Sequence, residues 1–116
     1  MNHRERKRDR YLRDPLPIRL GGLAADLARV ASTARHEPVN PAVVTMLEES
    51  QWFIEWTAAD TEIEVAAELV DIQRQVALWR RAWPEAQKQS IQRALLSVQA
   101  QKWSDQVLAY SGLLDG

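Results

Sequence analysis

The chain has 116 residues, of which 46% are hydrophobic and 27% are charged, proportions that are typical of soluble globular proteins. It contains no cysteine, which excludes disulfides, thiolate metal sites and cysteine nucleophiles. No apolar run approaches the roughly 18 residues of a membrane span, and no apolar segment follows the charged N-terminus as in a secretory signal. The sequence therefore predicts one cytoplasmic protein domain without a membrane span.

The net charge of −1 conceals strong segregation along the chain. Residues 1–13 hold six bases against two acids, whereas residues 37–73 hold nine acids and neither Lys nor Arg. Residues 74–116 are basic again, with six bases against three acids. We expect these blocks to pair within the chain or between protomers.

The first 13 residues lack a regular apolar pattern and are predicted to form a flexible, disordered basic arm. Their cationic side chains are candidate contacts for a partner or for nucleic-acid phosphates. The candidates are Arg4, Arg6, Lys7, Arg8 and Arg10. The prolines at positions 15 and 17 then mark the start of a single helical domain, residues 14–116.

Two helices are predicted in the first half of this domain. The first covers residues 17–34, because apolar side chains recur there at steps of three and four. These are Leu20, Leu23, Leu27, Val30 and Ala34. A linker at residues 36–39 leads to Asn40-Pro41, a favourable helix start, and the second helix runs to about Trp56 or Thr57. Its inner stripe consists of Val43, Met46, Leu47, Ser50, Phe53, Ile54 and Thr57.

Two more helices are predicted after a break at residues 57–61. The third carries an apolar stripe of Val65, Leu69, Ile72, Val76, Trp79 and Trp83, and Pro84 is expected to end it. The fourth opens at Pro84 and runs to about Tyr110, with Gly112 as its C-terminal cap. Its inner side is predicted to hold Ile91, Leu95, Val98, Trp103, Val107 and Tyr110. Short connections favour antiparallel neighbours, hence an all-α, up-down-up-down four-helix bundle.

Five tryptophans make the chain tryptophan-rich. Trp52 and Trp56 lie one turn apart beside the inner stripe of the second helix, among acidic residues. Tryptophan is common both in cores and at partner surfaces. We therefore take Trp52 and Trp56 as candidate partner-binding residues.

Carboxylates on facing helices are the other candidate site, because they can hold Mg²⁺. Glu68-x-x-Asp71 resembles half of the acidic signature of the all-α MazG-like and dUTPase-like nucleotide pyrophosphohydrolases. The resemblance implies Mg²⁺ held against a nucleoside triphosphate, with Glu48 and Glu49 supplying the preceding helix. The Glu-x-x-Glu of that helix is absent, however, since Trp52 follows Glu49 at the required position.

The sequence thus predicts a non-enzymatic helical interaction module or small regulatory subunit, without metal or cofactor, that binds a protein partner or self-associates. One alternative is a Mg²⁺-dependent pyrophosphohydrolase-like enzyme that uses Glu48, Glu49, Glu68 and Asp71. A second alternative is a nucleic-acid-associated protein that acts through the basic arm. Carboxylates that converge inside the bundle would favour the enzyme, whereas outward-facing carboxylates would favour the interaction module.

Overall fold

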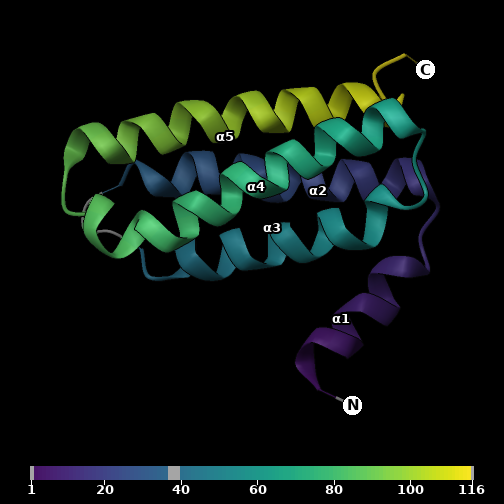
Figure 1. Cartoon of the computed structure of the whole chain (residues 1–116), viewed down its shortest axis with the longest axis horizontal. Coiled ribbons are helices and arrows are strands. Elements are labelled where there is room, and N and C mark those ends of the chain that lie inside the picture. Colours follow the sequence, from purple (N-terminus) through teal and green to yellow (C-terminus); the bar gives the residue numbers. More distant parts are fainter. Residues whose placement is uncertain (1, 37–39, 116) are drawn as a thin grey trace.

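The computed structural model describes residues 2–36 and 40–115, and every regular element in these ranges is a helix. The helices are α1 (His3–Leu12), α2 (Leu16–Ala34), α3 (Ala42–Ala58), α4 (Ile63–Ala86) and α5 (Ser90–Ser111). Figure 1 shows α2 to α5 side by side, with successive helices running in opposite directions, and α1 at one end. The all-helical prediction is confirmed. Residues 37–39, which hold most of the predicted linker, lie outside the described residues.

The N-terminal segment differs from the prediction, since residues 3–12 form α1 instead of a disordered arm. The described residues therefore contain five helices where four were predicted. The segment consists mainly of Arg, Lys and Glu, which favour helices even without an apolar stripe. The Asn2 side chain caps the helix, because its Oδ1 accepts a hydrogen bond from Glu5 N–H at 2.8 Å.

Helices α2 and α3 follow the predicted pattern closely. All five apolar positions of the predicted α2 stripe are buried, and so is the α3 stripe except for the half-buried Met46. At the start of α3, Asn40 Oδ1 accepts a hydrogen bond from Ala42 N–H at 2.9 Å. The predicted stripes therefore identify the core faces of both helices.

Helix α4 begins after the predicted break but does not end at Pro84, which lies inside its last turn. Proline removes one backbone donor, and near a helix end this loss is confined to a single turn. Trp83 and Ala86 are buried on either side of Pro84 and hold that turn against the core. Within the predicted stripe, Val65 and Trp79 are half-buried and the other members are buried.

Helix α5 begins at Ser90, six residues later than predicted, and Gly112 ends it with a φ of 73°, as predicted. Its early inner stripe is wrong: Ile91, Leu95 and Val98 are 64%, 50% and 58% exposed. The buried side of α5 instead carries Arg93, Leu96, Ser97, Ala100, Trp103, Ser104, Val107 and Ser111. The hydrophobic pattern thus gives the wrong face for the first half of this helix.

Small side chains explain the actual orientation of α5, because they allow its backbone to approach α2 closely. Ser97 Oγ donates a hydrogen bond to the Ala31 carbonyl oxygen at 2.6 Å. Ser104 Oγ donates one to the Ala24 carbonyl oxygen at 2.7 Å. Each buried hydroxyl therefore has a partner on the facing helix, and burial of these serines leaves no unsatisfied donor.

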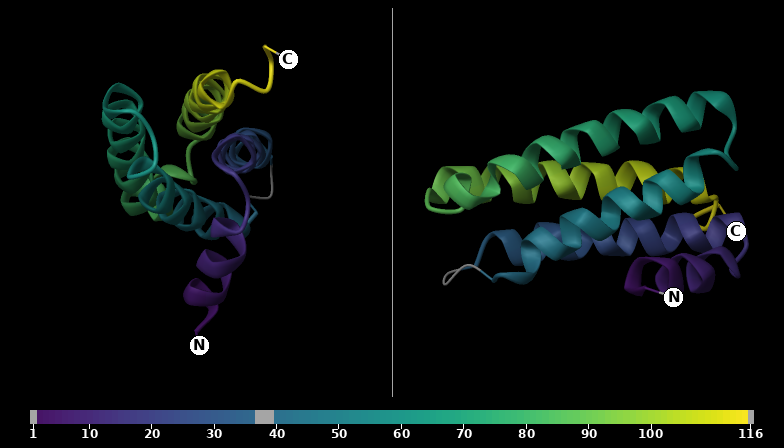
Figure 2. Two further views of the ribbon diagram at one scale, coloured as in Figure 1. Left: turned by 90° about the vertical axis from the view of Figure 1, so that its right-hand side faces the viewer. Right: turned by 60° about the horizontal axis from the view of Figure 1, so that its bottom comes forward.

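The helices do not contact one another equally. The most extensive interface joins α2 and α5, and α3 packs on both α4 and α2, whereas α4 and α5 contact each other only sparsely. Figure 2 shows α4 and α5 apart at the end where α4 begins. Among the described helices, none combines the length and the hydrophobicity that crossing a bilayer requires.

Candidate interaction surfaces

The two candidate tryptophans of α3 lie beneath α1. The Arg4 guanidinium carbon is 5.7 Å from the ring centroid of Trp52 and 5.5 Å from that of Trp56. Arg4 Nη2 also lies 2.8 Å from Glu55 Oε2. A cation over two aromatic faces and beside a carboxylate is favourably placed on both counts. One turn further on, Lys7 Nζ pairs with Glu49 Oε2 at 3.0 Å.

Tyr11 anchors the other end of α1. Its ring stacks on Phe53 with 4.6 Å between centroids. Its hydroxyl donates a hydrogen bond to the Arg19 carbonyl oxygen at 2.9 Å and lies 2.7 Å from Thr57 Oγ1, which can donate to it in turn. Burial raises the pKa of Tyr11 to about 12. This side chain therefore ties α1 to both α2 and α3.

The remaining basic candidates of α1 face solvent. Arg6, Arg8 and Arg10 are exposed, and none of them forms an ion pair within the part of the chain that the structure describes. The structure thus brings Arg4 and Lys7 to the α3 surface. It leaves the other three cations at the periphery of the molecule.

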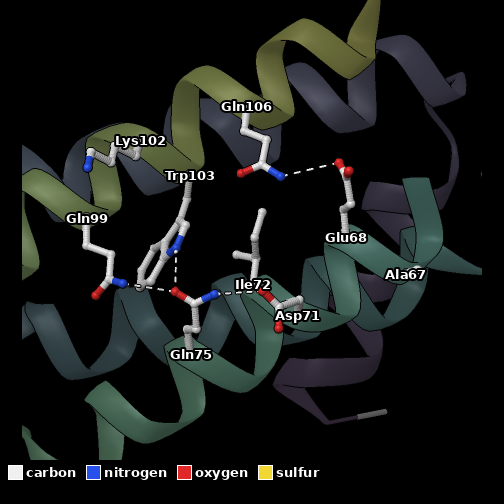
Figure 3. A pocket seen from close by; sticks show the side chains of 9 residues that line it. All are labelled: Ala67, Glu68, Asp71, Ile72, Gln75, Gln99, Lys102, Trp103 and Gln106. Atoms are coloured by element: carbon white, nitrogen blue, oxygen red, sulfur yellow. Dashed lines mark hydrogen bonds between the residues drawn. The ribbon is translucent and has the colours of Figure 1, made fainter. Parts of the chain in front are cut away.

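A cleft of about 480 Å³ separates α4 from α5. Figure 3 shows Glu68 and Asp71 on its α4 wall, with Gln106 and Trp103 opposite. Glu68 Oε2 accepts a hydrogen bond from Gln106 Nε2 at 3.4 Å, a long contact that spans the cleft. Asp71 Oδ1 accepts from Arg74 Nη2 at 2.8 Å, so one of its oxygens is already paired with a cation.

Amide side chains join the two walls at the narrower end of this cleft. Gln75 Oε1 accepts hydrogen bonds from Gln99 Nε2 at 2.9 Å and from Trp103 Nε1 at 3.2 Å. Gln75 Nε2 donates in turn to Asp71 Oδ2 at 2.9 Å. Trp79 Nε1 donates to Gln99 Oε1 at 2.6 Å. This network gives α4 and α5 polar contacts where their direct packing is sparse.

The four acids of the hydrolase alternative do not meet at one point. Glu68 and Asp71 line the α4–α5 cleft, but Glu48 forms an ion pair with Arg80, and Glu49 forms one with Lys7. Across residues 2–36 and 40–115, no group of three or more His, Asp or Glu side chains is arranged to hold a metal ion.

A further surface was not among the predicted sites. Ile91, Leu95 and Val98 lie on one side of α5 at steps of four and three, and we call these three residues the α5 outer face. A groove of about 240 Å³ beside it is lined by Gln75, Leu78, Trp79, Ala82 and Gln92. Another groove, of about 400 Å³, is lined by Arg35, Ala94, Ser97, Val98, Gln101, Lys102 and Asp105. The hydrophobic pattern had identified these three residues but assigned them to the core.

Comparison of the chain with protein-family models, with curated protein sequences and with solved structures gives no match in any of the three. The resemblance to pyrophosphohydrolases therefore rests on Glu68-x-x-Asp71 alone. Function has to be inferred from the geometry of the surfaces themselves.

Proposed function

We propose that the chain is a non-enzymatic interaction module, as a small regulatory subunit would be, and that it binds an amphipathic helix of a protein partner on the α5 outer face. The observation that supports this most directly is the exposure of Ile91, Leu95 and Val98, each at least half accessible to solvent. Water penalises a contiguous apolar surface, and monomeric proteins rarely keep large ones without a use. Covering the α5 outer face is the simplest such use.

The shape of the surface suits a helix. Side chains spaced at steps of four and three form a ridge along α5, and the two grooves lie beside that ridge. Ridges that fit into grooves are the general mode of helix packing. A partner helix with its own apolar stripe can therefore lie along α5 and bury all three side chains.

The charges beside the ridge indicate the flanks of the partner helix. Arg35 and Lys102 line the groove next to Val98, and neither forms an ion pair among the described residues. Asp105 is the single acid of that groove. Carboxylates on the partner, placed beside its apolar stripe, would complement this excess of positive charge. The proposed occupant is therefore an amphipathic helix with acidic flanks.

Two synthetic helices test the proposal. Both carry leucines at steps of four and three, one with Glu and the other with Lys at the flanking positions. We expect the Glu-flanked helix to bind at least tenfold more tightly, as measured by tryptophan fluorescence and by calorimetry. Leu95→Gln should weaken its binding by roughly tenfold or more, because it removes the centre of the ridge.

Val70→Gln is the matched control, since Val70 on α4 is 49% exposed and Leu95 is 50% exposed. It should leave both the helical circular dichroism and the peptide affinity unchanged. Equal affinity for both peptides, or an equal loss in the two variants, would mean that the α5 outer face is not a specific site.

A further inference from the structure

Helix α1 is attached to the rest of the molecule by the least extensive of the helix–helix interfaces described above. None of residues 3–12 is fully buried, Tyr11 is half-buried, and α1 packs mainly against α3. Two of its contacts are the ion pairs of Arg4 and Lys7, both of which are partly open to water. Exposed ion pairs contribute little stability and weaken with salt. Separation of α1 from the bundle should therefore need less free energy than separation of any other helix.

The surface beneath α1 is nevertheless specific. Three side chains of α1, namely Arg4, Lys7 and Tyr11, each meet a dedicated partner on α3. The guanidinium meets two indoles and a carboxylate, the ammonium meets a carboxylate, and the phenol meets a phenyl ring. We call this the α3 receptor surface; it consists of Glu49, Trp52, Phe53, Glu55 and Trp56. It recognises a basic helix with an aromatic residue at its C-terminal end.

We propose that α1 is an exchangeable helix, and that the α3 receptor surface of one copy accepts α1 from a second copy in a reciprocal dimer. The second copy is the proposed occupant because its Arg4, Lys7 and Tyr11 reproduce the contacts seen within one chain. Exchange therefore replaces each contact with an identical one. The equilibrium between the monomer and the exchanged dimer depends on the segment that joins α1 to α2 and on protein concentration.

Exchange requires the link between α1 and α2 to open. It consists of residues 13–15, and Pro15 already has extended dihedrals, with φ −65° and ψ 158°. The turn is held by Asp14 N–H, which donates to the Tyr11 carbonyl at 3.3 Å, and by Arg19 Nε, which donates to the Asp14 carbonyl at 3.0 Å. Opening this turn would let three extended residues span about 10 Å. The two α2 N-termini must therefore lie close together in the dimer.

Zero-length crosslinking of the intact chain tests the exchange. Equal amounts of unlabelled and ¹⁵N-labelled protein are mixed at micromolar to millimolar concentrations and treated with a carbodiimide, which joins Lys7 to Glu49 across their 3.0 Å ion pair. Mass spectrometry then shows whether the two peptides carry the same label. The internal control is the ion pair of Lys88 Nζ and Glu85 Oε1, which are 3.2 Å apart at the C-terminal end of α4. These two residues are three positions apart in the sequence, so exchange of α1 does not affect which chain they are joined in.

We expect the share of mixed-label Lys7–Glu49 crosslinks to rise with concentration towards about half, the statistical limit for complete exchange, while Lys88–Glu85 crosslinks keep a single label. Tyr11→Ala should remove both kinds of Lys7–Glu49 crosslink and leave the control intact. Single-label Lys7–Glu49 crosslinks at every concentration would overturn the proposal. So would the absence of this crosslink, or mixed-label crosslinks that persist in Tyr11→Ala. The α5 outer face is not involved, so either result leaves the proposed function to its own test.

Discussion

At the scale of single residues, Asp26 of α2 is the least expected feature. Its side chain is 1% exposed and lies between the Arg29 guanidinium and Ser50 Oγ, the latter at 2.8 Å. Burial raises the pKa of this carboxyl, although Arg29 and Ser50 favour the charged form. Ser50 Oγ also lies 2.8 Å from the Met46 carbonyl oxygen. Ser50 Oγ has one proton to donate to these two acceptors, so it stabilises the Asp26 carboxylate only in part and burial dominates.

Asp26 should therefore make stability depend on pH. Because its pKa is higher in the folded than in the unfolded state, the folded state binds this proton more tightly. The resulting stabilisation is full below the ordinary pKa of 3.8 and is lost as pH rises through the folded-state pKa. We expect Asp26→Asn to gain stability relative to the wild type as pH rises from 3.8 towards neutrality. Urea unfolding at a series of pH values measures this difference.

The exposed Asp105 provides the control, since Asp105→Asn should change the free energy of unfolding by no more than a few tenths of a kcal/mol at neutral pH. A difference between Asp26→Asn and wild type that stays constant over the whole pH range would contradict the assignment of this pH dependence to Asp26.

At the scale of elements, the helices α2, α3 and α4 could be predicted from apolar spacing because their largest side chains face the core. Helix α5 could not, because the pattern ranks Ile, Leu and Val above Ser and Ala. The signal that reveals its true face is the seven-residue spacing of Ser97, Ser104 and Ser111, the first two of which lie opposite Ala31 and Ala24. Such small residues mark a close helix contact, and a hydrophobicity scale gives them little weight.

Neighbouring leucines of α5 give a direct test of its orientation. Leu96 is fully buried and Leu95 is half exposed. Leu96→Ala should lower the free energy of unfolding by about 2–5 kcal/mol, because it leaves a cavity. Leu95→Ala should change it by less than about 0.5 kcal/mol. Chemical denaturation of the two variants measures both values, and the reverse order would restore the face that the hydrophobic pattern predicts.

Helix α1 was missed for another reason. Its docking depends on Arg4, Lys7 and Tyr11, which meet α3 through charge and aromatic faces, and such side chains leave no apolar periodicity. The sequence did identify both halves of this contact, the basic segment and the Trp52–Trp56 pair. It could not indicate that the two halves bind each other, because their proximity depends on the chain turning back at residues 13–15.

At the scale of the whole molecule, the charge blocks pair within the chain. Cations of α1, α2 and α4 form ion pairs with five acids of the acidic segment, namely Arg4–Glu55, Lys7–Glu49, Arg19–Asp60, Arg74–Asp71 and Arg80–Glu48. The acids of the hydrolase alternative are therefore spread over separate contacts. Mg²⁺ needs several oxygens at one point, and a site formed only by Glu68 and Asp71 would supply few of them.

We accordingly expect Mg²⁺ or Mn²⁺ at millimolar concentrations to leave the melting temperature unchanged, since a ligand that binds the folded state must raise it. Differential scanning fluorimetry measures this, with a chelator as the reference condition. A metal-dependent rise that disappears in Glu68→Gln or Asp71→Asn would favour the pyrophosphohydrolase alternative over the interaction module.

The extensive contact between α2 and α5 also has a consequence for how the chain folds. The hydrogen bonds from Ser97 to Ala31 and from Ser104 to Ala24 join residues 66 and 80 positions apart. Closing such long loops is slow compared with forming the α3–α4 hairpin, which is local in sequence. On the ribosome, α2 is made before α5 and must wait for it before the side of α2 that faces α5 is covered. The nascent chain is therefore most prone to aggregation just before α5 is released.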